Sequence, residues 1–588
     1  MSVGGSGWNI NQVVHDHRIL GCILPYLRRT KFDVCIVGSG AGAGPVAYEL
    51  SLAGYKVCVL EKGPWIKTDQ FSKDEMTATR RSVYTPNLKD ERHVIVKPKK
   101  DGTWEAKSTY QTGKDYWNGN LVGGSSNFMS AYFHRLKPQD FKLKSTYGEI
   151  EGANVVDWPI DYENLEPYYT KVESIVGVSG KVVPHKHLEP RSTVDFPYPP
   201  LQENLLASWL DAAAYELDYE LFPSPRGIIS RSKGNRKSCY YSNYCGSYGC
   251  SSGAKSSSRV ALLNDAVASG NCTIIDHAKV CHLTTDGNGA VTEAQYYDAG
   301  DNKQSVSAKL FVVAAQAIET SRLLLMSKNE DCPDGLSNNN GQVGKNLVFS
   351  GGGIGSGQVL YDELNPEEVS DIKQPGLFIN RASQHWYEID DESFKKPLKG
   401  GTIDFVSEHA NAITKAIGQK RNNDGSLRIG ADLKEQLHFY FTKQRTFKFE
   451  VFVDWLPTDN CRVELDPDVT DKWGDPVARA YVGYHDHDLE VGRYLAKKGE
   501  ELFRKAGLKN VRSSVSGGVS PNLQAGGCRF GDNPKTSVLD KNCKSHEIDN
   551  LYVTDGSFMP TGGSVPYTFT IYANAFRVAD RIKEHLAS

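Results

Sequence analysis

The sequence lacks the features that mark several classes of protein. No run of about 18 consecutive apolar residues occurs, so no membrane-spanning helix is predicted. The net charge is only −3 over 588 residues, which gives no indication of a nucleic acid or an anionic membrane as partner. Internal repeats and low-complexity linkers are also missing. We therefore expect a globular protein that acts on a small-molecule substrate.

The start of the chain has no layout of a secretory signal. Its first apolar stretch, residues 19–27, is short, contains a proline and is followed by Arg28 and Arg29 rather than by small residues. We treat residues 1–29 as an N-terminal extension and predict a cytoplasmic protein. Most of the 12 cysteines are scattered along the chain, as buried small apolar residues usually are.

Glycine, in contrast, is plentiful and clustered. Many of the 55 glycines fall in short groups such as GSGAGAG, VGGSS and SGGGIGSG. Glycine lets the backbone turn sharply and approach a ligand closely. These clusters therefore predict loops around a cofactor.

The first cluster lies inside a strand–helix–strand pattern. Residues 33–37 predict a buried strand, residues 42–53 a helix, and residues 56–60 a second buried strand that ends before Glu61. Gly38 permits the tight turn after the first strand, and Gly40 lets the backbone approach a pyrophosphate at the helix N-terminus. Glu61 stands where a carboxylate binds ribose hydroxyls. The pattern predicts a dinucleotide site, although it does not by itself distinguish FAD from NAD.

The remaining pattern predicts two domains woven from separate segments. Residues 310–314 read as another buried strand, residues 370–490 show the alternation typical of antiparallel strands, and HFYFTKQRTFKFEVFVDW is its strongest example. The C-terminal residues return to a strand, a glycine loop and a helix. We expect a dinucleotide-binding domain from residues 30–160, 225–355 and 515–588, and an inserted substrate domain from residues 161–224 and 356–514.

Five segments resemble the signatures of one known family. They are WNGNLVGGSSNFM at residues 117–129, AIET at 317–320, VGKNL at 343–347, CRFG at 528–531 and LYVTDGS at 551–557. Through these motifs, in this order, the chain resembles the glucose–methanol–choline (GMC) oxidoreductase family, in its branch of bacterial sugar and alcohol dehydrogenases.

The resemblance implies both the fold and the cofactor. It implies an α/β fold, with a Rossmann-like FAD-binding domain and a second α+β substrate domain built on a large antiparallel sheet. In the family, the glycine–serine loop lies along the flavin and the Asp–Gly pair binds the phosphates and ribityl chain of FAD. The FAD-binding residues predicted in this way are Gly38, Gly40, Ala41, Gly42, Glu61, Lys62, Gly123, Gly124, Ser125, Asn127, Met129, Val280, Asp555, Gly556, Pro566, Tyr567 and Thr568.

The sequence departs from the family at the two catalytic positions. Family members usually oxidise an alcohol by passing hydride to flavin N5 while a His accepts the hydroxyl proton, assisted by a second His or an Asn. Here those positions hold Leu523 and Val565, which cannot accept a proton. A shift of one residue would place Asn522 or Gln524 at the first position, but an amide is a very poor base. The usual acid–base pair is therefore predicted to be missing.

Two functions follow from this combination. The first is an FAD-dependent oxidoreductase that acts on the CH–OH group of an alcohol or sugar with an unconventional base. The second is a flavoprotein on the same scaffold with altered or non-oxidative chemistry, such as a lyase or a silent subunit. The Leu523 and Val565 pair favours the second function, and the FAD-binding segments fit both.

Three cysteines fall close together at Cys239, Cys245 and Cys250. They resemble a cysteine-rich loop of bacterial sugar-dehydrogenase relatives, some of which hold an iron–sulfur cluster that passes electrons to a partner haem protein. The alternative is a turn-rich loop with free thiols or one disulfide, because the spacing matches no standard ferredoxin or zinc pattern. An iron–sulfur cluster and an electron-accepting protein partner are thus kept as alternatives.

Two histidines with neighbouring acids, in the segment YHDHD, raise the question of a metal site. His485 and His487 alternate with aspartates at a predicted helix start, where acidic groups stabilise the N-terminus. We favour this structural interpretation over a metal pair. His134 and Arg135 follow the flavin loop, where they could face the cofactor or form a structural ion pair.

Overall fold

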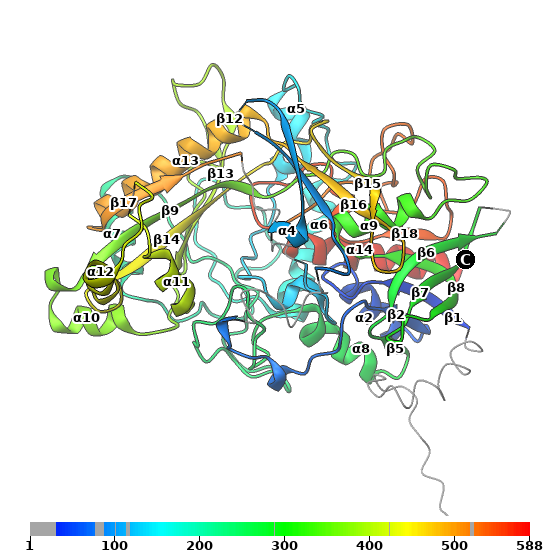
Figure 1. The fold of residues 1–588 in the computed structure, drawn as a ribbon, viewed down its shortest axis with the longest axis horizontal. Helices are drawn as coiled ribbons and strands as arrows, with labels where there is room; N and C mark the ends of the chain where they lie inside the picture. The colour runs from blue at the N-terminus through cyan, green and yellow to red at the C-terminus, as the bar shows by residue number, and fades with distance from the viewer. Residues whose placement is uncertain are drawn as a thin grey trace, which may run out of the picture.

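The computed structural model describes residues 31–76, 88–99, 101–112, 118–286, 289–422, 424–517 and 523–588. The N-terminal extension and Asn522 lie outside these described residues. Figure 1 shows two bodies side by side, one built on the sheet of β1, β2 and β8 and the other on the sheet of β9, β13 and β14. The predicted α/β fold with a second sheet-based domain is confirmed.

The first body is built on a seven-stranded sheet in the order β5-β2-β1-β8-β7-β6, with β18 also paired to β8. Strands β5, β2, β1, β8 and β18 run parallel, whereas β6, β7 and β8 form an antiparallel meander. Their bounds are β1 Phe32–Val37, β2 Val57–Leu60, β5 Cys272–Ile275, β6 Lys279–Thr285, β7 Val291–Tyr297, β8 Lys303–Val313 and β18 Leu551–Val553.

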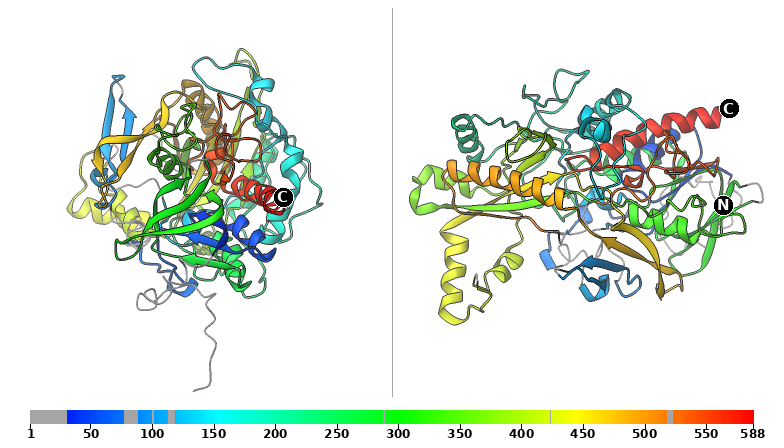
Figure 2. Two further views of the ribbon diagram at one scale, coloured as in Figure 1. Left: turned by 90° about the vertical axis from the view of Figure 1, so that its right-hand side faces the viewer. Right: turned by 90° about the horizontal axis from the view of Figure 1, so that it is seen from above.

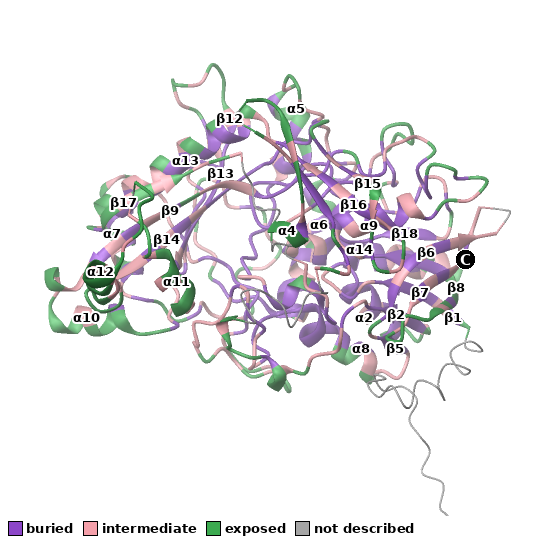
Figure 3. Ribbon diagram, viewed as in Figure 1, coloured by how far each residue is buried: buried purple, intermediate pink, exposed green. Residues whose placement is uncertain are grey.

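This sheet collects strands from distant parts of the chain, and its parallel core is formed by short apolar segments. Strands β2 and β18 are buried along their whole length, as is the end of β8. Helices α2 (Gly44–Leu52) and α14 (Thr568–Ala587) contact each other beside it. Figure 3 shows the buried residues concentrated through these central elements. The limits that we assigned to the domains stay a prediction.

The second body is a five-stranded antiparallel sheet in the order β10-β13-β14-β9-β17. Its strands are β9 Gly351–Leu360, β10 Arg381–Ser383, β13 Gly401–Ser407, β14 Gln444–Val453 and β17 Lys509–Ser514. The long helix α13 (Asp486–Lys505) packs along one face and contacts β9, β14 and β17. The right-hand view of Figure 2 shows α13 lying along this sheet.

Smaller elements connect the two bodies. A four-stranded sheet contains β15 (Cys461–Thr470), β16 (Pro476–Val482), β3 (Val94–Pro98) and β4 (Trp104–Ser108), and a two-stranded one contains β11 (Glu388–Ile389) and β12 (Leu398–Lys399). The remaining α-helices are α4 Thr109–Thr112, α5 Leu143–Tyr147, α6 Tyr162–Val172, α7 Leu206–Glu216, α8 Asn264–Ala268, α9 Ala317–Met326, α10 Pro366–Lys373, α11 Ala412–Gly418 and α12 Gly430–Thr442. None of the described helices is long and apolar enough to cross a membrane.

One glycine cluster does not form the predicted cofactor loop. The cluster SGGGIGSG spans residues 350–357, and all of it except Ser350 belongs to strand β9. The ring of Phe449 lies directly over Gly355 of this strand. A Cβ at Gly355 would come within 2.0 Å of that ring, and one at Gly499 of α13 within 2.6 Å of it. Gly355 and Gly499 are needed because the sheet and α13 leave room between them for the Phe449 ring.

The prediction that residues 438–455 are all strand is also partly wrong. Residues 438–442 belong to helix α12, and β14 begins only at Gln444. Leu433, Leu437 and Phe441 are spaced four apart, and they line a groove together with Ile413 and Ile417 of α11. The four-residue spacing of these apolar side chains is typical of a helix and runs into the first aromatic residues of the alternating segment. There it outweighs the local preference of those residues for a strand.

The structural interpretation of His485 is confirmed. It is the N-cap of α13, and its Nδ1 accepts a hydrogen bond from the backbone N–H of His487 at 3.2 Å. Asp488, at the third helical position, lies 3.3 Å from the backbone N–H of His485. The pair of histidines therefore starts a helix.

Substitution of Gly355 by Ala is expected to destabilise the protein by about 1–3 kcal/mol, because the new methyl group overlaps a fully buried ring. The denaturant midpoint of the purified protein measures this. The matched control is Gly418→Ala in α11, where a Cβ would meet nothing within 4 Å. Equal midpoints for the two variants would contradict the packing role of Gly355.

Candidate active site

A cavity of about 570 Å³ lies between the two sheets. The carboxyl ends of β1, β2 and β8 line one part of it, and β14 lines another. Parallel strands commonly bind ligands at this edge, where their loops leave a crevice. Segments from residues 37–62, 118–132, 278–280, 314–326 and 555–571 meet here.

The glycine turn after β1 leaves room for a ligand. A Cβ at Gly40 would meet no protein atom within 4 Å, although the residue lines the cavity. A Cβ at Gly42 would come within 2.5 Å of the Thr554 carbonyl oxygen. A side chain at position 42 would therefore clash with the protein itself. A side chain at position 40 would clash with no protein atom and would only take up space that a ligand in the cavity needs.

Glu61 lies at the carboxyl end of β2, as the sequence predicts. Its carboxylate accepts hydrogen bonds from Ser39 Oγ at 2.5 Å and from the Gly63 N–H at 2.9 Å. Burial raises the pKa of Glu61 to about 7, against the opposing effect of these donors. Ser39 in turn accepts a hydrogen bond from the Gly123 N–H at 2.9 Å, which ties the turn to the glycine–serine loop.

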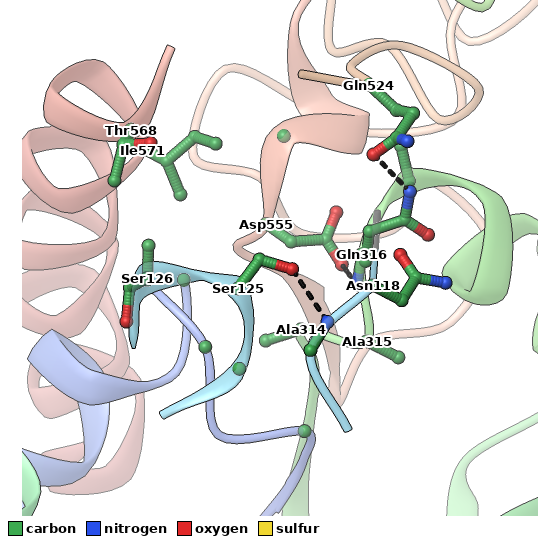
Figure 4. A pocket seen from close by; sticks show the side chains of 18 of the residues that line it. Asn118, Ser125, Ser126, Ala314, Ala315, Gln316, Gln524, Asp555, Thr568 and Ile571 are labelled. Atoms are coloured by element: carbon green, nitrogen blue, oxygen red, sulfur yellow. Dashed lines mark hydrogen bonds between the residues drawn. The ribbon is translucent and has the colours of Figure 1, made fainter. Parts of the chain in front are cut away.

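Asp555 anchors a second network, shown in Figure 4. It accepts hydrogen bonds from the Gln316 N–H at 3.1 Å and from Thr320 Oγ1 at 2.5 Å. The Gln316 side-chain amide donates to Gln524 Oε1 at 2.6 Å, and its oxygen caps helix α9. Burial raises the pKa of Asp555 above its usual value. This network joins β8, α9 and β18 at one edge of the cavity.

Most of the predicted cofactor residues line this cavity. Gly123 and Asn127 are the exceptions: the Asn127 amide donates to the carbonyls of Val122 and Gly124, at 3.1 and 2.9 Å, and so shapes the loop from behind. The predicted residues that line the cavity are Gly38, Gly40, Ala41, Gly42, Glu61, Lys62, Gly124, Ser125, Met129, Val280, Asp555, Gly556, Pro566, Tyr567 and Thr568. Their contact with FAD stays a prediction.

The predicted catalytic positions are placed differently from one another. Leu523 and Gln524 line the cavity. Val565 is fully buried in the main hydrophobic core, next to the cavity-lining Pro566. Leucine and valine carry no base, and the amide of Gln524 is a very poor one that is also hydrogen-bonded to Gln316. None of these three positions therefore holds a group as basic as an imidazole.

Sequence reasoning missed the wall that the second sheet contributes. Tyr132, Ser350, His409, Glu450 and Phe452 also line the cavity. Their side chains come from loops and from β14, and no motif marks them. Tyr132 alone could have been suspected from the sequence, because it follows the glycine–serine loop by a few residues.

The cysteine loop gives no support to an iron–sulfur cluster. Burial raises the pKa of Cys239 to about 12 and that of Cys245 above its usual value, whereas the charge of Lys255 and nearby hydrogen bonds outweigh burial and lower the pKa of Cys250. The Lys255 ammonium donates to the carbonyls of Cys245 and Tyr248 at 2.5 and 2.9 Å and so occupies the loop itself. Within the described ranges, no three His, Cys, Asp or Glu side chains form a metal-binding group.

His134 and Arg135 are structural, the second of the two interpretations above. His134 Nε2 lies 2.9 Å from Asp404 Oδ2, and both residues are buried. Arg135 pairs with Glu166 and Glu173, each at 2.9 Å. His134 holds the loop after the cavity wall against β13 of the second sheet, and Arg135 holds it against α6 and the turn that follows α6.

The cavity fits a flavin dinucleotide. Small residues line the turn and the glycine–serine loop, which leaves space for a flat ring and for phosphates near the start of α2. The Asn118 Oδ1 atom, at the cavity wall, is buried and has no hydrogen-bond partner among the described residues. The Glu61 carboxylate lies at the other end of the cavity lining, where it would accept hydrogen bonds from ribose hydroxyls. These residues would hold FAD from its adenosine half to its ring.

Comparison with known proteins identifies the family. Models described as GMC oxidoreductase match residues 105–349 and 457–575. The chain is 31% identical to 2-methyl-1,2-propanediol dehydrogenase of Mycolicibacterium austroafricanum, over 94% of this chain and 96% of the relative. It is 26% identical to the fructose dehydrogenase large subunit of Gluconobacter japonicus, over 94% and 98% of the two chains.

Solved structures share the fold at low identity. Pyridoxine 4-oxidase from Mesorbium loti superposes with a TM-score of 0.60 at 17% identity, over 94% of this chain and 100% of that one. Formate oxidase gives a TM-score of 0.62 at 15% identity, over 95% and 98% of the two chains.

Substitution of Gly40 by Val is expected to abolish FAD retention without unfolding the protein, since the side chain would enter space that no protein atom occupies. Flavin absorbance per mole of purified protein measures retention, and circular dichroism checks the fold. Gly418→Ala serves as the control and should keep its flavin. Full flavin content in Gly40→Val would contradict this placement of the cofactor.

FAD affinity is expected to rise with pH by about tenfold as Glu61 loses its proton, because only the carboxylate accepts two ribose hydroxyls. Quenching of FAD fluorescence by apoprotein at about pH 5.5 and about pH 8.5, either side of the raised pKa, measures the change. Glu61→Gln should bind more weakly and with no such rise. An identical rise in that variant would assign the pH dependence to another group.

Proposed function

Because this chain belongs to the GMC oxidoreductase family and is an FAD-dependent enzyme, we propose that it oxidises a CH–OH group of a small alcohol or sugar. One observation carries this proposal. A single cavity is lined both by the predicted FAD-binding segments and by polar side chains of the second sheet. A substrate bound against that sheet would therefore lie next to the flavin.

The chemistry divides between cofactor and protein. FAD, when bound, supplies the acceptor for a hydride. The residues of the chain must bind the alcohol, exclude water and accept the proton of its hydroxyl group. A neutral alcohol is a poor hydride donor, so the proton acceptor is the part that the protein has to provide.

The composition of the wall favours a partly apolar alcohol. Its lining includes the apolar residues Leu523, Phe452 and Met129 and the polar residues Tyr132, Ser350 and Glu450. A branched diol combines both characters, and the relative with 31% identity is named for 2-methyl-1,2-propanediol. Small branched alcohols and diols are therefore the first substrates to test. An electron-accepting protein stays a prediction.

A second function is favoured by one residue. Leu523 lines the cavity at the position where the family usually has its base. An apolar side chain there suits an apolar substrate and non-oxidative chemistry, as in a lyase-like flavoprotein. The two functions differ in one measurable event, which is the reduction of FAD by an alcohol.

Anaerobic addition of 2-methyl-1,2-propanediol, or of another member of a panel of alcohols and sugars, is expected to bleach the flavin absorbance of the purified holoprotein. A sugar without a free hydroxyl, such as a fully methylated glucoside, is the control and should leave the spectrum unchanged. Failure of a broad panel to bleach the flavin would favour the non-oxidative function.

Leu523→His is expected to raise the bleaching rate by about tenfold or more, because it places an imidazole at the cavity wall. Rapid mixing under anaerobic conditions measures the rate. Leu523→Met, of similar volume and without a base, is the control. An unchanged rate in Leu523→His would mean that this position takes no part in removal of the proton.

A further inference from the structure

Glu450 presents a carboxylate to the cavity from the middle of β14. Side chains along a strand alternate between its two faces. Phe449 and Val451 pack into the core behind the sheet, and Glu450 and Phe452 line the cavity in front of it. The strand thus carries one acidic residue into the proposed active site, between two core residues that fix its position.

The neighbours of Glu450 are themselves held in place. Asp404 of β13 is paired with it across the sheet. Asp404 is fully buried, lies 2.9 Å from His134 Nε2 and accepts a hydrogen bond from Ser224 Oγ at 2.7 Å. These partners engage the Asp404 carboxylate, so Glu450 is the carboxylate of the pair that faces the cavity.

Arg226 and Tyr132 complete the surroundings. The Arg226 guanidinium lies 3.7 Å from the centre of the Tyr132 ring and donates to the Ser130 carbonyl at 3.2 Å. The Tyr132 hydroxyl interacts with the Glu450 carboxylate, and Ser350 Oγ is buried without a hydrogen-bond partner among the described residues. Both line the cavity beside Glu450. A carboxylate with a tyrosine hydroxyl and a guanidinium beside it suits a ligand that carries a hydroxyl group.

The electrostatic balance keeps Glu450 basic enough to accept a proton. Burial, and next the charge of Asp404, raise the pKa of Glu450 above its usual value, and Arg226, Lys448 and Tyr132 oppose the rise. Proton transfer is most efficient when the pKa of the acceptor lies near the working pH. A buried carboxylate beside a second one is therefore a better acceptor than an exposed glutamate.

His409 is the other titratable group of this wall. Burial, with the nearby positive charge of Lys255, lowers the pKa of His409 to about 4. The imidazole is therefore neutral near pH 7 but is a weak base. Leu523 carries no base at all, and the Gln524 amide is held by Gln316. Among the described residues of this wall, Glu450 is the strongest candidate for proton removal.

We propose that Glu450 accepts the hydroxyl proton of the substrate alcohol, in place of the base usually found at position 523. The inference rests on the proposed function, since it names the catalytic group of that same site.

The step balances within the site. The O–H bond of the alcohol breaks and its proton converts the Glu450 carboxylate to a carboxylic acid. The C–H bond of the same carbon breaks with both of its electrons, the hydride is taken up by FAD, and a C=O bond forms. The products are one aldehyde or ketone, one reduced flavin and one protonated Glu450.

The test compares wild type with Glu450→Gln, which keeps the size and hydrogen-bonding of the side chain and removes its ability to accept a proton. Anaerobic rapid mixing with 2-methyl-1,2-propanediol is expected to give a flavin reduction rate about 100- to 10,000-fold lower in the variant. The wild-type rate should rise with pH as Glu450 ionises, and that rise should disappear in the variant. Glu450→Asp, a shorter carboxylate, should recover part of the rate.

A binding measurement separates loss of the base from loss of the site. 2-Methyl-2-propanol has no hydrogen on its carbinol carbon, so it cannot be oxidised but can occupy the site. Its binding, followed by the change in visible flavin absorbance, should differ by less than about threefold between wild type and Glu450→Gln. Flavin content and melting temperature of the variant should also match wild type.

The control is Glu464→Gln, at a carboxylate of β15 that pairs with Arg462 at 2.6 Å and whose side chain is 46% exposed. It should reduce at the wild-type rate. Wild-type bleaching with an equal rate in Glu450→Gln would overturn this inference and leave the proposed function standing. Absence of bleaching in wild type would overturn both. If Glu450→Gln lost both the binding of 2-methyl-2-propanol and the flavin reduction rate, Glu450 would be assigned to substrate binding. That result would overturn its role as base.

Discussion

The close approach of two glycine-containing loops is the constraint on which the rest of the site depends. A Cβ at Gly124 would lie 3.1 Å from the Cα of Gly40, so any side chain there would push the glycine–serine loop away from the turn after β1. Ser39 links the same loops through Glu61 and the Gly123 N–H. Because the loops meet, the end of the parallel sheet, the predicted cofactor segments and the second sheet border one cavity rather than separate surfaces.

The second sheet performs two tasks because a strand has two faces. Toward α13 it is packed with aromatic rings, and the glycines of β9 exist to accommodate them. Toward the cavity the same strand β14 presents Glu450 and Phe452. Packing on one face fixes the position of polar groups on the other, which a catalytic site requires. A carboxylate on a central strand is therefore held more firmly than one on a loop would be.

The predictable parts of the structure were local. The strand–turn–helix around Gly38 and Gly40, the acid at the end of β2 and the N-cap at His485 all follow from short-range rules about backbone conformation and helix ends. Where the interpretation was wrong, contacts between residues distant in the sequence outweighed the local preference. Gly355 of β9 makes room for Phe449, and residues 438–442 continue helix α12, whose apolar residues line a groove with those of α11.

By itself the sequence determined the cofactor half of the protein, because an anion-binding turn needs particular residues at particular spacings along the chain. It also determined that Leu523 and Val565 replace the usual catalytic pair. Only the tertiary structure decided which other side chains line the same cavity as Leu523. Glu450 is far from Leu523 in the sequence, and it reaches the cavity because pairing of β14 with β13 and β9 sets which residues point forward. Strand register is a property of the folded sheet, so no motif in the sequence announces it.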